Sequence, residues 1–496
     1  MTSAVNFLDI LDHHAQTRAD RPALHSEGAV LTYAQLWDRI HRFGNVLKAL
    51  GIRPQDRVVL AFPDSPDSCY AFFGALACGA LPALISPDLS RQEYAYILRD
   101  CEPSLLVTVG GSAAAAAEPA GPMKRLLLDD GTLPARMADA DPVLIRHPAA
   151  PEDPAFIQYT SGSTGDPKGI VHTQAGMLFT ARHYAGEVLK LSENDVVFSV
   201  SKMSFGYGFG NSVIFPLYHG AAAVLYPGRP TPADVLQVLD RYRPTLLFSV
   251  PTFYNMLLKI MDGPILLPSL RLCVSAGEAL PESTYRSWRE LTGLSIVNGV
   301  GATEALHIFI SQRPGDIRPG ASGFPVPGYE VRIVGDDGKP AAEGQQGILQ
   351  VRGGSTAPCY WNRPEKSAET MLPDGWLRTG DYFIEDKGCY TYQGRQDDLF
   401  KVSGAWVAPL KVEEALRTHP AVAECAVTSR RLEGLEKPLA YVVLNAGFTE
   451  GMALTRELRS HVLARLPDYM CPVQFNYVQE IPKTSTGKVQ KYVLRR

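Results

Sequence analysis

The chain has 496 residues, of which 45% are apolar and 20% charged, and its formal net charge is −4. At about 100–200 residues per domain, this length predicts two or more domains. The small net charge and the absence of a run of ~20 apolar residues argue against nucleic-acid binding and membrane spanning. The eight scattered Cys residues include no CxxC pair, and the chain opens without a secretory signal. We therefore expect a cytoplasmic protein.

Short apolar runs alternate with helical patterns over the first 280 residues. Helical spacing begins at Leu31 and returns at residues 75–78, whereas residues 111–121 are rich in Ala and Gly and are expected to form a surface connection. This alternation predicts an α/β fold with two largely parallel sheets. The predicted strands are residues 57–62, 81–85, 195–200, 221–225, 245–250 and 272–275.

A change of pattern near Gly328 predicts a different kind of unit. Short alternating strands with Gly-rich turns follow it, which favours a small β-rich subdomain. After Asp397 the chain shows a helical pattern at 412–417 and strand patterns at 424–428 and 439–444. We predict a large N-terminal domain, residues 1–396, made of two α/β subdomains and the β-rich subdomain. A small α+β C-terminal domain, residues 397–496, is expected to follow.

Residues 159–169, Tyr-Thr-Ser-Gly-Ser-Thr-Gly-Asp-Pro-Lys-Gly, are the most informative stretch and follow the apolar run 155–157. Glycine permits close backbone approach, hydroxyl groups and amides donate hydrogen bonds, and lysine adds positive charge. The stretch therefore predicts a phosphate-binding loop, although the order differs from a Walker A motif. A solvated surface loop is the alternative. The expected phosphate contacts are Thr160, Ser161, Ser163, Thr164 and Lys168.

This stretch resembles the phosphate loop of the adenylate-forming superfamily, which includes acyl-CoA synthetases, peptide-synthetase adenylation domains and luciferases. Four further stretches resemble that superfamily's other motifs and follow in the same order. They are residues 298–304 (adenine and magnesium), 376–381 (ribose), 394–398 (hinge) and 482–488 (catalytic lysine). The resemblance implies ATP and Mg²⁺ as cofactors.

The resemblance assigns a role to individual residues of these motifs. Thr303 matches a phosphate contact, and Glu304 matches the magnesium ligand, a hard oxygen donor of the kind that Mg²⁺ prefers. Asp381 and Arg395 match contacts to the ribose. The remaining expected nucleotide contacts are Gly277, Glu278, Asn298 and Gly299.

Lys488 matches the lysine that contacts both the carboxylate and the α-phosphate during adenylation. One mobile cation can neutralise both reacting anions. Lys491 is expected to be solvated or to face phosphate. Asp397 matches the hinge about which a mobile C-terminal domain rotates between two half-reactions. Gly404, within Lys401-Val402-Ser403-Gly404, would then line the tunnel for coenzyme A.

Within the superfamily the chain resembles the benzoate-CoA ligases most, through residues 205–211, 305–311, 358–362 and 401–404. The likeness implies an aryl slot with aromatic and aliphatic walls and glycine floors. His307 could donate a hydrogen bond to a carboxylate or a ring substituent, or could be a satisfied structural residue. The implied slot is lined by Gly206, Tyr207, Gly299, Gly301, His307 and Ile308.

One position departs from the benzoate pattern. Benzoate-specific members tend to carry alanine where this chain has Gly206. Loss of that methyl frees space, so we hypothesise a ring with a small ortho substituent, as in 2-aminobenzoate (anthranilate) or salicylate. The resulting expectation is an AMP-forming aryl-CoA ligase, a monomer or homodimer that uses ATP, an aromatic acid and coenzyme A.

Two alternatives stay open at this point. A stand-alone adenylation enzyme that loads a carrier protein would share every nucleotide motif. A non-catalytic nucleotide-binding scaffold would be expected to have lost Lys488 or Glu304, and both are present.

Overall fold

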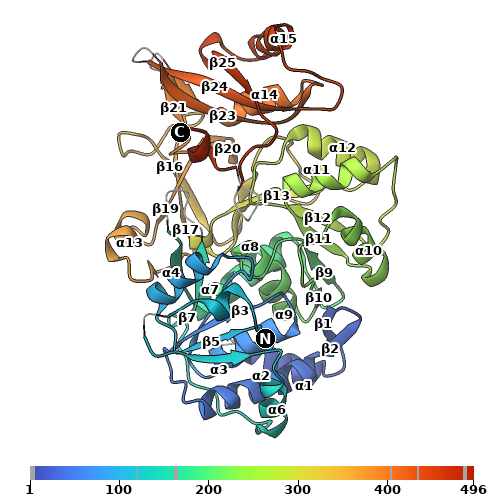
Figure 1. Ribbon diagram of the computed structural model, residues 1–496, viewed down its shortest axis with the longest axis vertical. Helices are drawn as coiled ribbons and strands as arrows, with labels where there is room; N and C mark the ends of the chain where they lie inside the picture. Colours follow the sequence, from blue (N-terminus) through green and yellow to red (C-terminus); the bar gives the residue numbers. More distant parts are fainter. Residues whose placement is uncertain are drawn as a thin grey trace.

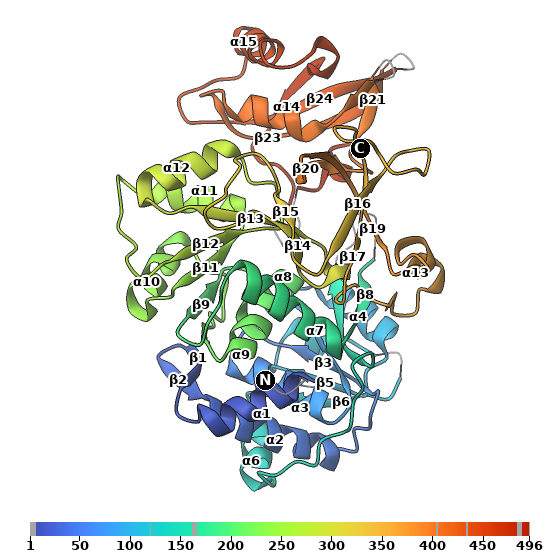
Figure 2. The same ribbon diagram turned by 180° about the vertical axis from the view of Figure 1, so that it is seen from behind.

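The computed structural model describes residues 6–119, 121–160, 166–402, 405–432, 435–483 and 489–495. Figure 1 shows a large N-terminal part that carries a small C-terminal domain at one end, and Figure 2 shows the same arrangement from behind. The predicted mixed α/β class is confirmed. No helix in the described ranges combines the length and apolar character that crossing a membrane requires.

The first α/β subdomain is built on a parallel sheet in the order β4–β3–β5–β6. Its strands are β3 (Arg57–Ala61), β4 (Leu81–Leu84), β5 (Leu105–Thr108) and β6 (Lys124–Leu127), and its helices are α2 (Tyr33–Ala49), α3 (Pro66–Ala77), α4 (Arg91–Cys101), α5 (Ala113–Ala116) and α6 (Thr132–Asp139). The expected surface connection 111–121 contains α5, where Ala114 is buried. That expectation was wrong for residues 113–116, because small alanine side chains can also form a short helix and pack against the core.

The second α/β subdomain contains a nine-stranded sheet in the order β15–β14–β13–β12–β11–β9–β10–β1–β2. The strands β9 to β13 and β1 pair in parallel, whereas β2, β14 and β15 are antiparallel additions. The strands are β1 (Pro22–Ser26), β2 (Ala29–Thr32), β9 (Val196–Ser199), β10 (Ala222–Val224), β11 (Leu246–Ser249), β12 (Leu272–Ser275), β13 (Ile296–Gly301), β14 (Ile308–Ser311) and β15 (Phe324–Pro325). Its helices are α1 (Phe7–Thr17), α10 (Pro232–Tyr242), α11 (Pro251–Ile260) and α12 (Glu282–Thr292).

A three-stranded antiparallel sheet, β18–β8–β7, lies between these subdomains (Figure 1). It consists of β7 (Pro154–Thr160), β8 (Lys168–Thr173) and β18 (Cys359–Tyr360). A helical stretch follows β8, and a second follows β9. They comprise α7 (Gln174–Thr180), η1 (Ala181–Val188), α8 (Gly206–Phe209), η2 (Gly210–Ile214) and α9 (Phe215–His219).

The predicted β-rich subdomain is confirmed as an antiparallel sheet, β16–β17–β19–β20. Its strands are β16 (Glu330–Val334), β17 (Gly347–Arg352), β19 (Leu377–Asp386) and β20 (Cys389–Arg395), with α13 (Pro364–Thr370) beside them and η3 (Thr303–Ala305) before them in the chain. β20 ends two residues before Asp397, so the expected hinge directly follows a sheet strand.

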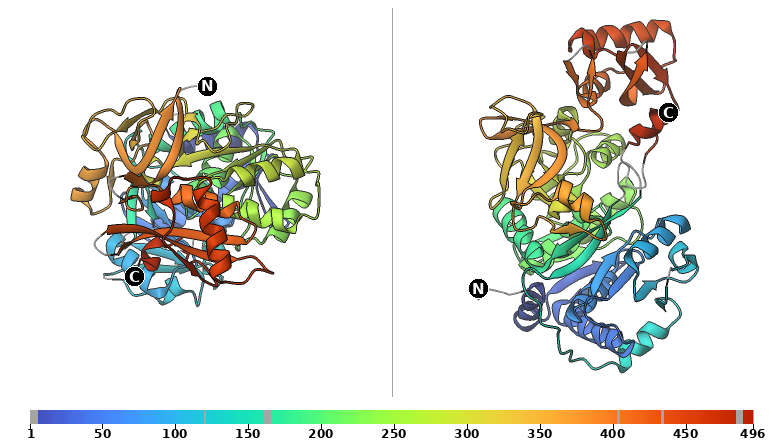
Figure 3. Two further views of the ribbon diagram at one scale, coloured as in Figure 1. Left: turned by 90° about the horizontal axis from the view of Figure 1, so that it is seen from above. Right: turned by 90° about the vertical axis from the view of Figure 1, so that its left-hand side faces the viewer.

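The C-terminal domain is a compact α+β unit with its own apolar core. Figure 3 shows it standing apart from the first subdomain at the far end of the molecule. Its elements are β21 (Phe400–Val402), β22 (Ala405–Val407), α14 (Pro409–Arg417), β23 (Val422–Leu432), β24 (Leu435–Leu444), α15 (Met452–Leu463), η4 (Asp468–Met470), β25 (Gln474–Tyr477) and α16 (Lys491–Leu494).

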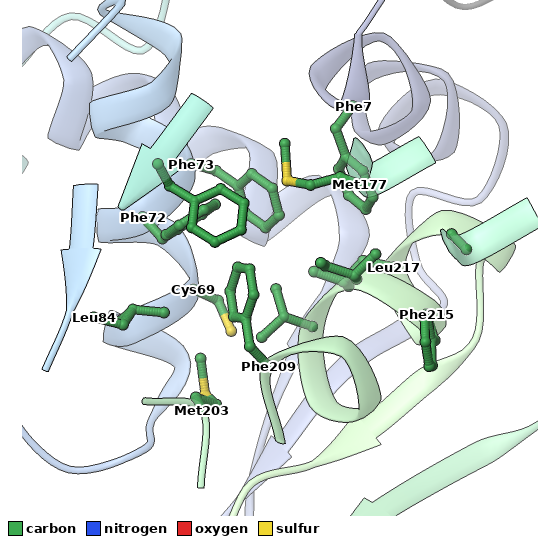
Figure 4. Close-up of a cluster of buried hydrophobic side chains, with 14 of the residues drawn as sticks. Phe7, Cys69, Phe72, Phe73, Leu84, Met177, Met203, Phe209, Phe215 and Leu217 are labelled. Atoms are coloured by element: carbon green, nitrogen blue, oxygen red, sulfur yellow. The ribbon is translucent and has the colours of Figure 1, made fainter. Parts of the chain in front are cut away.

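Aromatic packing fixes the helix that carries Gly206. Figure 4 shows Phe72 and Phe73 of α3 beside Phe209 at the end of α8. The Phe209 ring centroid lies 4.7 Å from that of Phe72 and 5.3 Å from that of Phe156 on β7. These rings are fully or almost fully buried. Helices α3 and α8 and strand β7 therefore share one core, which holds α8 against β7.

A buried carboxylate fastens the C-terminal domain internally. Glu413 of α14 lies 2.8 Å from the Lys491 Nζ and 3.5 Å from Arg417 Nη2, and it accepts a 2.8 Å bond from the Val427 amide. Lys491 is therefore partly buried and paired with a buried carboxylate, contrary to the solvated or phosphate-facing role expected from the sequence. Burial acts to raise the pKa of Glu413, but the two cations outweigh it and hold the pKa below its ordinary value.

We expect Glu413→Gln to destabilise the protein by about 2–3 kcal/mol near pH 7, because it removes the anion that pairs with the partly buried Lys491. A lowered folded pKa gives stability that is present above the unfolded pKa of about 4.3 and is lost as the pH falls through the folded value. The difference between wild type and variant should therefore shrink in acid. Denaturant unfolding at several pH values measures it, with Glu450→Gln, an exposed carboxylate of the same domain, as the matched control.

Candidate active site

The predicted phosphate loop is carried by the β7–β8 hairpin. Thr160 ends β7 and pairs with Lys168, the first residue of β8. The expected contacts Ser161, Ser163 and Thr164 lie outside the described residues. A Cβ at Gly169 would come within 2.9 Å of the Ile157 side chain, so glycine is required for the hairpin to close here. The two described candidates, Thr160 and Lys168, therefore stand side by side at the mouth of the loop.

Glu304, the expected magnesium ligand, is oriented by a tyrosine on another strand. The Tyr360 hydroxyl donates a 2.7 Å hydrogen bond to Glu304 Oε1, and the Ala357 amide donates to the Glu304 carbonyl at 2.7 Å. Tyr360 pairs with Ile170 on β8, which ties Glu304 to the phosphate hairpin. Burial and the carboxylate raise the pKa of Tyr360, so its hydroxyl stays protonated as a donor. Tyr360 lies in the stretch 358–362 that resembles the benzoate-CoA ligases, but this resemblance assigned no role to it.

The ribose candidates Asp381 and Arg395 face each other across a strand pair. They are register partners on β19 and β20, and Arg395 Nη1 lies 3.3 Å from Asp381 Oδ1. Negative charge raises the pKa of Arg395, first from Asp381 and also from Glu304 and Asp397. The guanidinium therefore stays charged between the ribose motif, the magnesium motif and the hinge, which brings three predicted motifs to one place.

The adenine-side candidates lie at the carboxyl ends of parallel strands β12 and β13, the usual place for ligands in such sheets. Gly277 has a φ of +88°, a conformation that favours glycine. Asn298 is buried, and its Oδ1 has no hydrogen-bond partner among the described residues. Glu278 instead accepts bonds from the Thr252 hydroxyl and amide at 2.6 and 3.2 Å. Its carboxylate thus already caps α11.

His307, the expected polar group of the aryl slot, has a defined protonation state. Its Nε2 lies 3.2 Å from the Tyr207 carbonyl oxygen and 3.1 Å from Asn211 Oδ1. A carbonyl oxygen can only accept, so Nε2 carries the proton and Nδ1 is bare. Burial lowers the pKa of His307 to about 3, so the ring is neutral. In this arrangement Nε2 already has two protein acceptors, which favours the alternative of a satisfied structural histidine over a donor to the substrate.

Neighbouring atoms block the positions that a side chain would take at the glycines around His307. A Cβ at Gly299 would meet the Ile308 side chain at 2.7 Å, and one at Gly301 would meet the His307 carbonyl oxygen at 2.5 Å. These two positions therefore require glycine because β13 and β14 approach closely. They do not provide free space in the floor of the expected aryl slot. Gly206 differs, because its Cβ position is 3.0 Å from the Leu306 carbonyl oxygen and farther from every other atom.

A buried ion pair that the sequence reading missed holds the loop before α8. Lys202 Nζ lies 3.1 Å from Asp64 Oδ2, and the Met203 amide donates to the same carboxylate at 3.1 Å. Asp64 follows β3 in the first subdomain, so the pair joins both α/β subdomains next to Gly206. Nothing in the local sequence distinguishes Asp64 from a surface carboxylate, because its partner is 138 positions away.

Lys488 and Gly404 lie outside the described residues, but the chain on both sides of Lys488 is anchored. Lys483 and Val489 form a β-bridge, and the Gln490 amide donates to the Pro482 carbonyl at 2.8 Å. Lys483 Nζ also pairs with Glu424 at 2.7 Å, and Lys491 pairs with Glu413. The lysine motif is thus fixed to β23 and α14 at its two ends.

The fold and the motif-bearing strand ends define an enzyme of the adenylate-forming class, and comparison with known families agrees. A family described as AMP-binding enzyme matches residues 11–361, and one described as AMP-binding enzyme C-terminal domain matches residues 411–488.

Individual relatives narrow the class. The chain is 42% identical over 476 residues to a benzoate-CoA ligase of Thauera aromatica, covering 94% of this chain and 90% of the relative. It is 38% identical over 508 residues to an anthranilate-CoA ligase of Pseudomonas aeruginosa, covering 100% and 97%. The crystal structure of an anthranilate CoA ligase in complex with anthranoyl-AMP superposes with a TM-score of 0.91, at 37% identity and with 99% and 96% of the chains covered. This chain belongs to the AMP-binding enzyme family, in the branch of the benzoate-CoA and other aryl-CoA ligases.

Proposed function

We propose that this protein is an AMP-forming aryl-CoA ligase, whose substrate is benzoate or an ortho-substituted benzoate such as 2-aminobenzoate or salicylate. One observation carries the proposal. The aryl-side Gly206 and the phosphate-motif Thr303 are neighbours, because a Cβ at Gly206 would lie 3.8 Å from Thr303 Cγ2. An aryl acid held at Gly206 would therefore present its carboxylate next to a nucleotide phosphate.

The proposed reaction has two steps. A carboxylate oxygen attacks the α-phosphorus of ATP, the bond to the β-phosphate breaks, and diphosphate leaves with that bond's electron pair. The thiolate of coenzyme A then attacks the acyl carbon, the thioester forms, and AMP leaves. Both reactants of the first step are anions, so the protein must offset their repulsion and the charge that develops on phosphate. In this proposal Lys488 and Thr303 supply that stabilisation, and Asp381 with Arg395 holds the ribose.

The residues present fit a magnesium ion that binds together with ATP. Glu304 is a partly buried carboxylate with one oxygen oriented by Tyr360. Within the described ranges no group of three or more His, Cys, Asp or Glu side chains could hold a metal on its own. A single carboxylate combined with phosphate oxygens is the usual arrangement for Mg²⁺. Bound there, the ion would neutralise phosphate charge, while Glu304 keeps it in place.

A panel of aryl acids tests the proposal against both alternatives. With ATP, Mg²⁺ and benzoate or 2-aminobenzoate, we expect diphosphate release, and added coenzyme A should give AMP turnover with the aryl-CoA product. Adenylate formation without thioester formation from coenzyme A would favour a carrier-protein acceptor. Absence of AMP with every acid would favour the non-catalytic scaffold and would overturn the proposal.

Gly206→Ala should narrow acceptance toward unsubstituted benzoate. The added methyl would occupy the space beside the Leu306 carbonyl oxygen, so we expect kcat/KM for 2-aminobenzoate relative to benzoate to fall about tenfold or more. Gly176→Ala in α7 is the matched control, because its Cβ would meet nothing closer than 3.4 Å. An unchanged ratio in Gly206→Ala would reject the ortho-substituent hypothesis.

A further inference from the structure

Asp100, in the last turn of α4, joins the first α/β subdomain to the phosphate hairpin β7–β8. The Tyr159 hydroxyl donates a 2.7 Å hydrogen bond to Asp100 Oδ2, and Arg363 Nη2 lies 2.8 Å from Asp100 Oδ1. The Asp100 side chain is 6% exposed. Each oxygen of this buried carboxylate is therefore paired with a group from a distant part of the chain.

The main chain of Asp100 contacts the same region. Its carbonyl oxygen accepts hydrogen bonds from Trp361 Nε1 and from Asn362 Nδ2, each at 3.1 Å. The Trp361 amide in turn donates to the Gly169 carbonyl oxygen at 2.7 Å. Tyr159 and Gly169 are register partners on β7 and β8. Asp100 thus holds both strands of the hairpin, one directly and the other through Trp361.

These contacts lie next to the two described phosphate candidates. Tyr159 directly precedes Thr160, and Gly169 directly follows Lys168. Thr160 and Lys168 are themselves register partners where the hairpin opens into the loop. A shift of the hairpin would therefore move both candidates together, and small displacements of binding groups weaken binding and catalysis strongly.

The position of Asp100 is unfavourable for the helix that carries it. A carboxylate in the last turn of a helix opposes the helix dipole, which favours cations there. Burial of the charge adds to this cost unless partners compensate for it. Tyr159 and Arg363 supply the compensation, so the end of α4 and the hairpin stabilise each other in this arrangement.

We propose that Asp100 is a positioning residue that fixes Thr160 and Lys168 for the phosphates of ATP; this rests on the proposed aryl-CoA ligase function. Asp100 acts through the hairpin and does not touch the nucleotide. Its loss affects nucleotide binding more than binding of the aromatic acid, because the aryl-slot candidates of α8 lie on another element.

Asp100→Asn tests the proposal, because it removes the charge at the same volume. The probe is the Mg²⁺ complex of α,β-methylene-ATP, whose α–β linkage cannot be cleaved. In isothermal titration calorimetry its Kd should rise about tenfold or more, and kcat/KM for ATP should fall by a similar factor. The KM for benzoate at saturating ATP should stay within about twofold of wild type. Unchanged affinity for the probe, or equal losses for ATP and benzoate, would overturn the proposal.

Asp195→Asn is the matched control. Asp195 has a 5% exposed side chain, and its Oδ1 pairs with Arg271 Nε at 2.7 Å and accepts from the Thr245 hydroxyl at 2.7 Å. It precedes β9, at the amino ends of the parallel strands and away from the hairpin. The unfolding midpoint should fall in this variant, but the Kd of the probe should stay within about twofold of wild type. An equal loss of probe affinity in both variants would reduce Asp100 to a stabilising residue and would overturn the proposal.

Tyr159→Phe keeps the ion pair between Asp100 and Arg363, so it tests the link even if Asp100→Asn does not fold. Probe affinity should fall by about threefold to tenfold, and the double variant should lose no more than Asp100→Asn alone, since both changes break one link. Wild-type affinity in Tyr159→Phe would overturn the proposal. AMP formation by the wild type would still support the aryl-CoA ligase function in that case, whereas no AMP with any aromatic acid would refute the function itself.

Discussion

Lys488→Ala is expected to reduce aryl-adenylate formation by roughly 10²–10³-fold or more, because it removes the cation that we propose neutralises both reacting anions. Thioester formation from a supplied aryl-adenylate should be much less affected, since no diphosphate leaves in that step. Single-turnover diphosphate release measures the first half-reaction. Consumption of synthetic aryl-adenylate with coenzyme A measures the second.

Lys483→Ala is the matched control for this experiment. It deletes a lysine five positions away in the same motif, but Lys483 Nζ is paired with Glu424 at 2.7 Å and is thus committed to the C-terminal domain. Adenylate formation should therefore persist in Lys483→Ala. Equal losses in both half-reactions for Lys488→Ala would contradict the role given to Lys488.

Asp397→Pro is expected to impair one half-reaction selectively, by about tenfold or more relative to the other. Proline fixes φ near −65° and restricts the preceding residue, so the rotation that we propose for the C-terminal domain would be blocked. The amides of Gln396 and Asp398 are bonded to Gly380 and Arg395, whereas Asp397 offers its carbonyl to Arg495 Nη1 at 3.0 Å. The change therefore acts on rotation and removes none of these bonds.

Asp397→Ala separates side-chain loss from lost rotation, because it deletes the carboxylate and keeps the backbone free. Both half-reactions should stay within a few-fold of wild type in that variant. If Asp397→Pro leaves the two rates in their wild-type ratio, Asp397 is not the pivot. Unfolding midpoints of both variants should be compared first, so that a selective kinetic defect is not confused with reduced stability.

Local pattern was sufficient to predict the layered fold. Several strands are apolar runs buried between helices, and such runs can be recognised in the sequence without knowing which strands pair. They are residues 57–61, 196–199, 246–249 and 272–275. The β-rich subdomain was equally visible, because Gly-rich turns separate its alternating strands. The surface connection predicted for residues 111–121 was wrong in part, because alanine is compatible with both a surface connection and a short packed helix.

The partners of the polar side chains could not be predicted from the sequence. Tyr360 orients Glu304 from 56 positions away, and Asp64 reaches Lys202 across two subdomains. The protonation of His307 depends on Asn211 and on a backbone carbonyl, so its structural role could only be seen in three dimensions. Motifs located the predicted nucleotide contacts, but motifs do not state which polar atoms are already occupied.

The close-packed glycines also bear on how substrate range can be altered by engineering. A Cβ would lie 2.1 Å from the Lys202 carbonyl oxygen at Gly208, 2.3 Å from His307 Cδ2 at Gly210 and 2.7 Å from Ile308 at Gly299. Libraries randomised at these three sites should consist mostly of misfolded clones, whatever acid is used for selection. Diversity is better placed at Gly206, where the nearest atom to a new Cβ, the Leu306 carbonyl oxygen, lies 3.0 Å away.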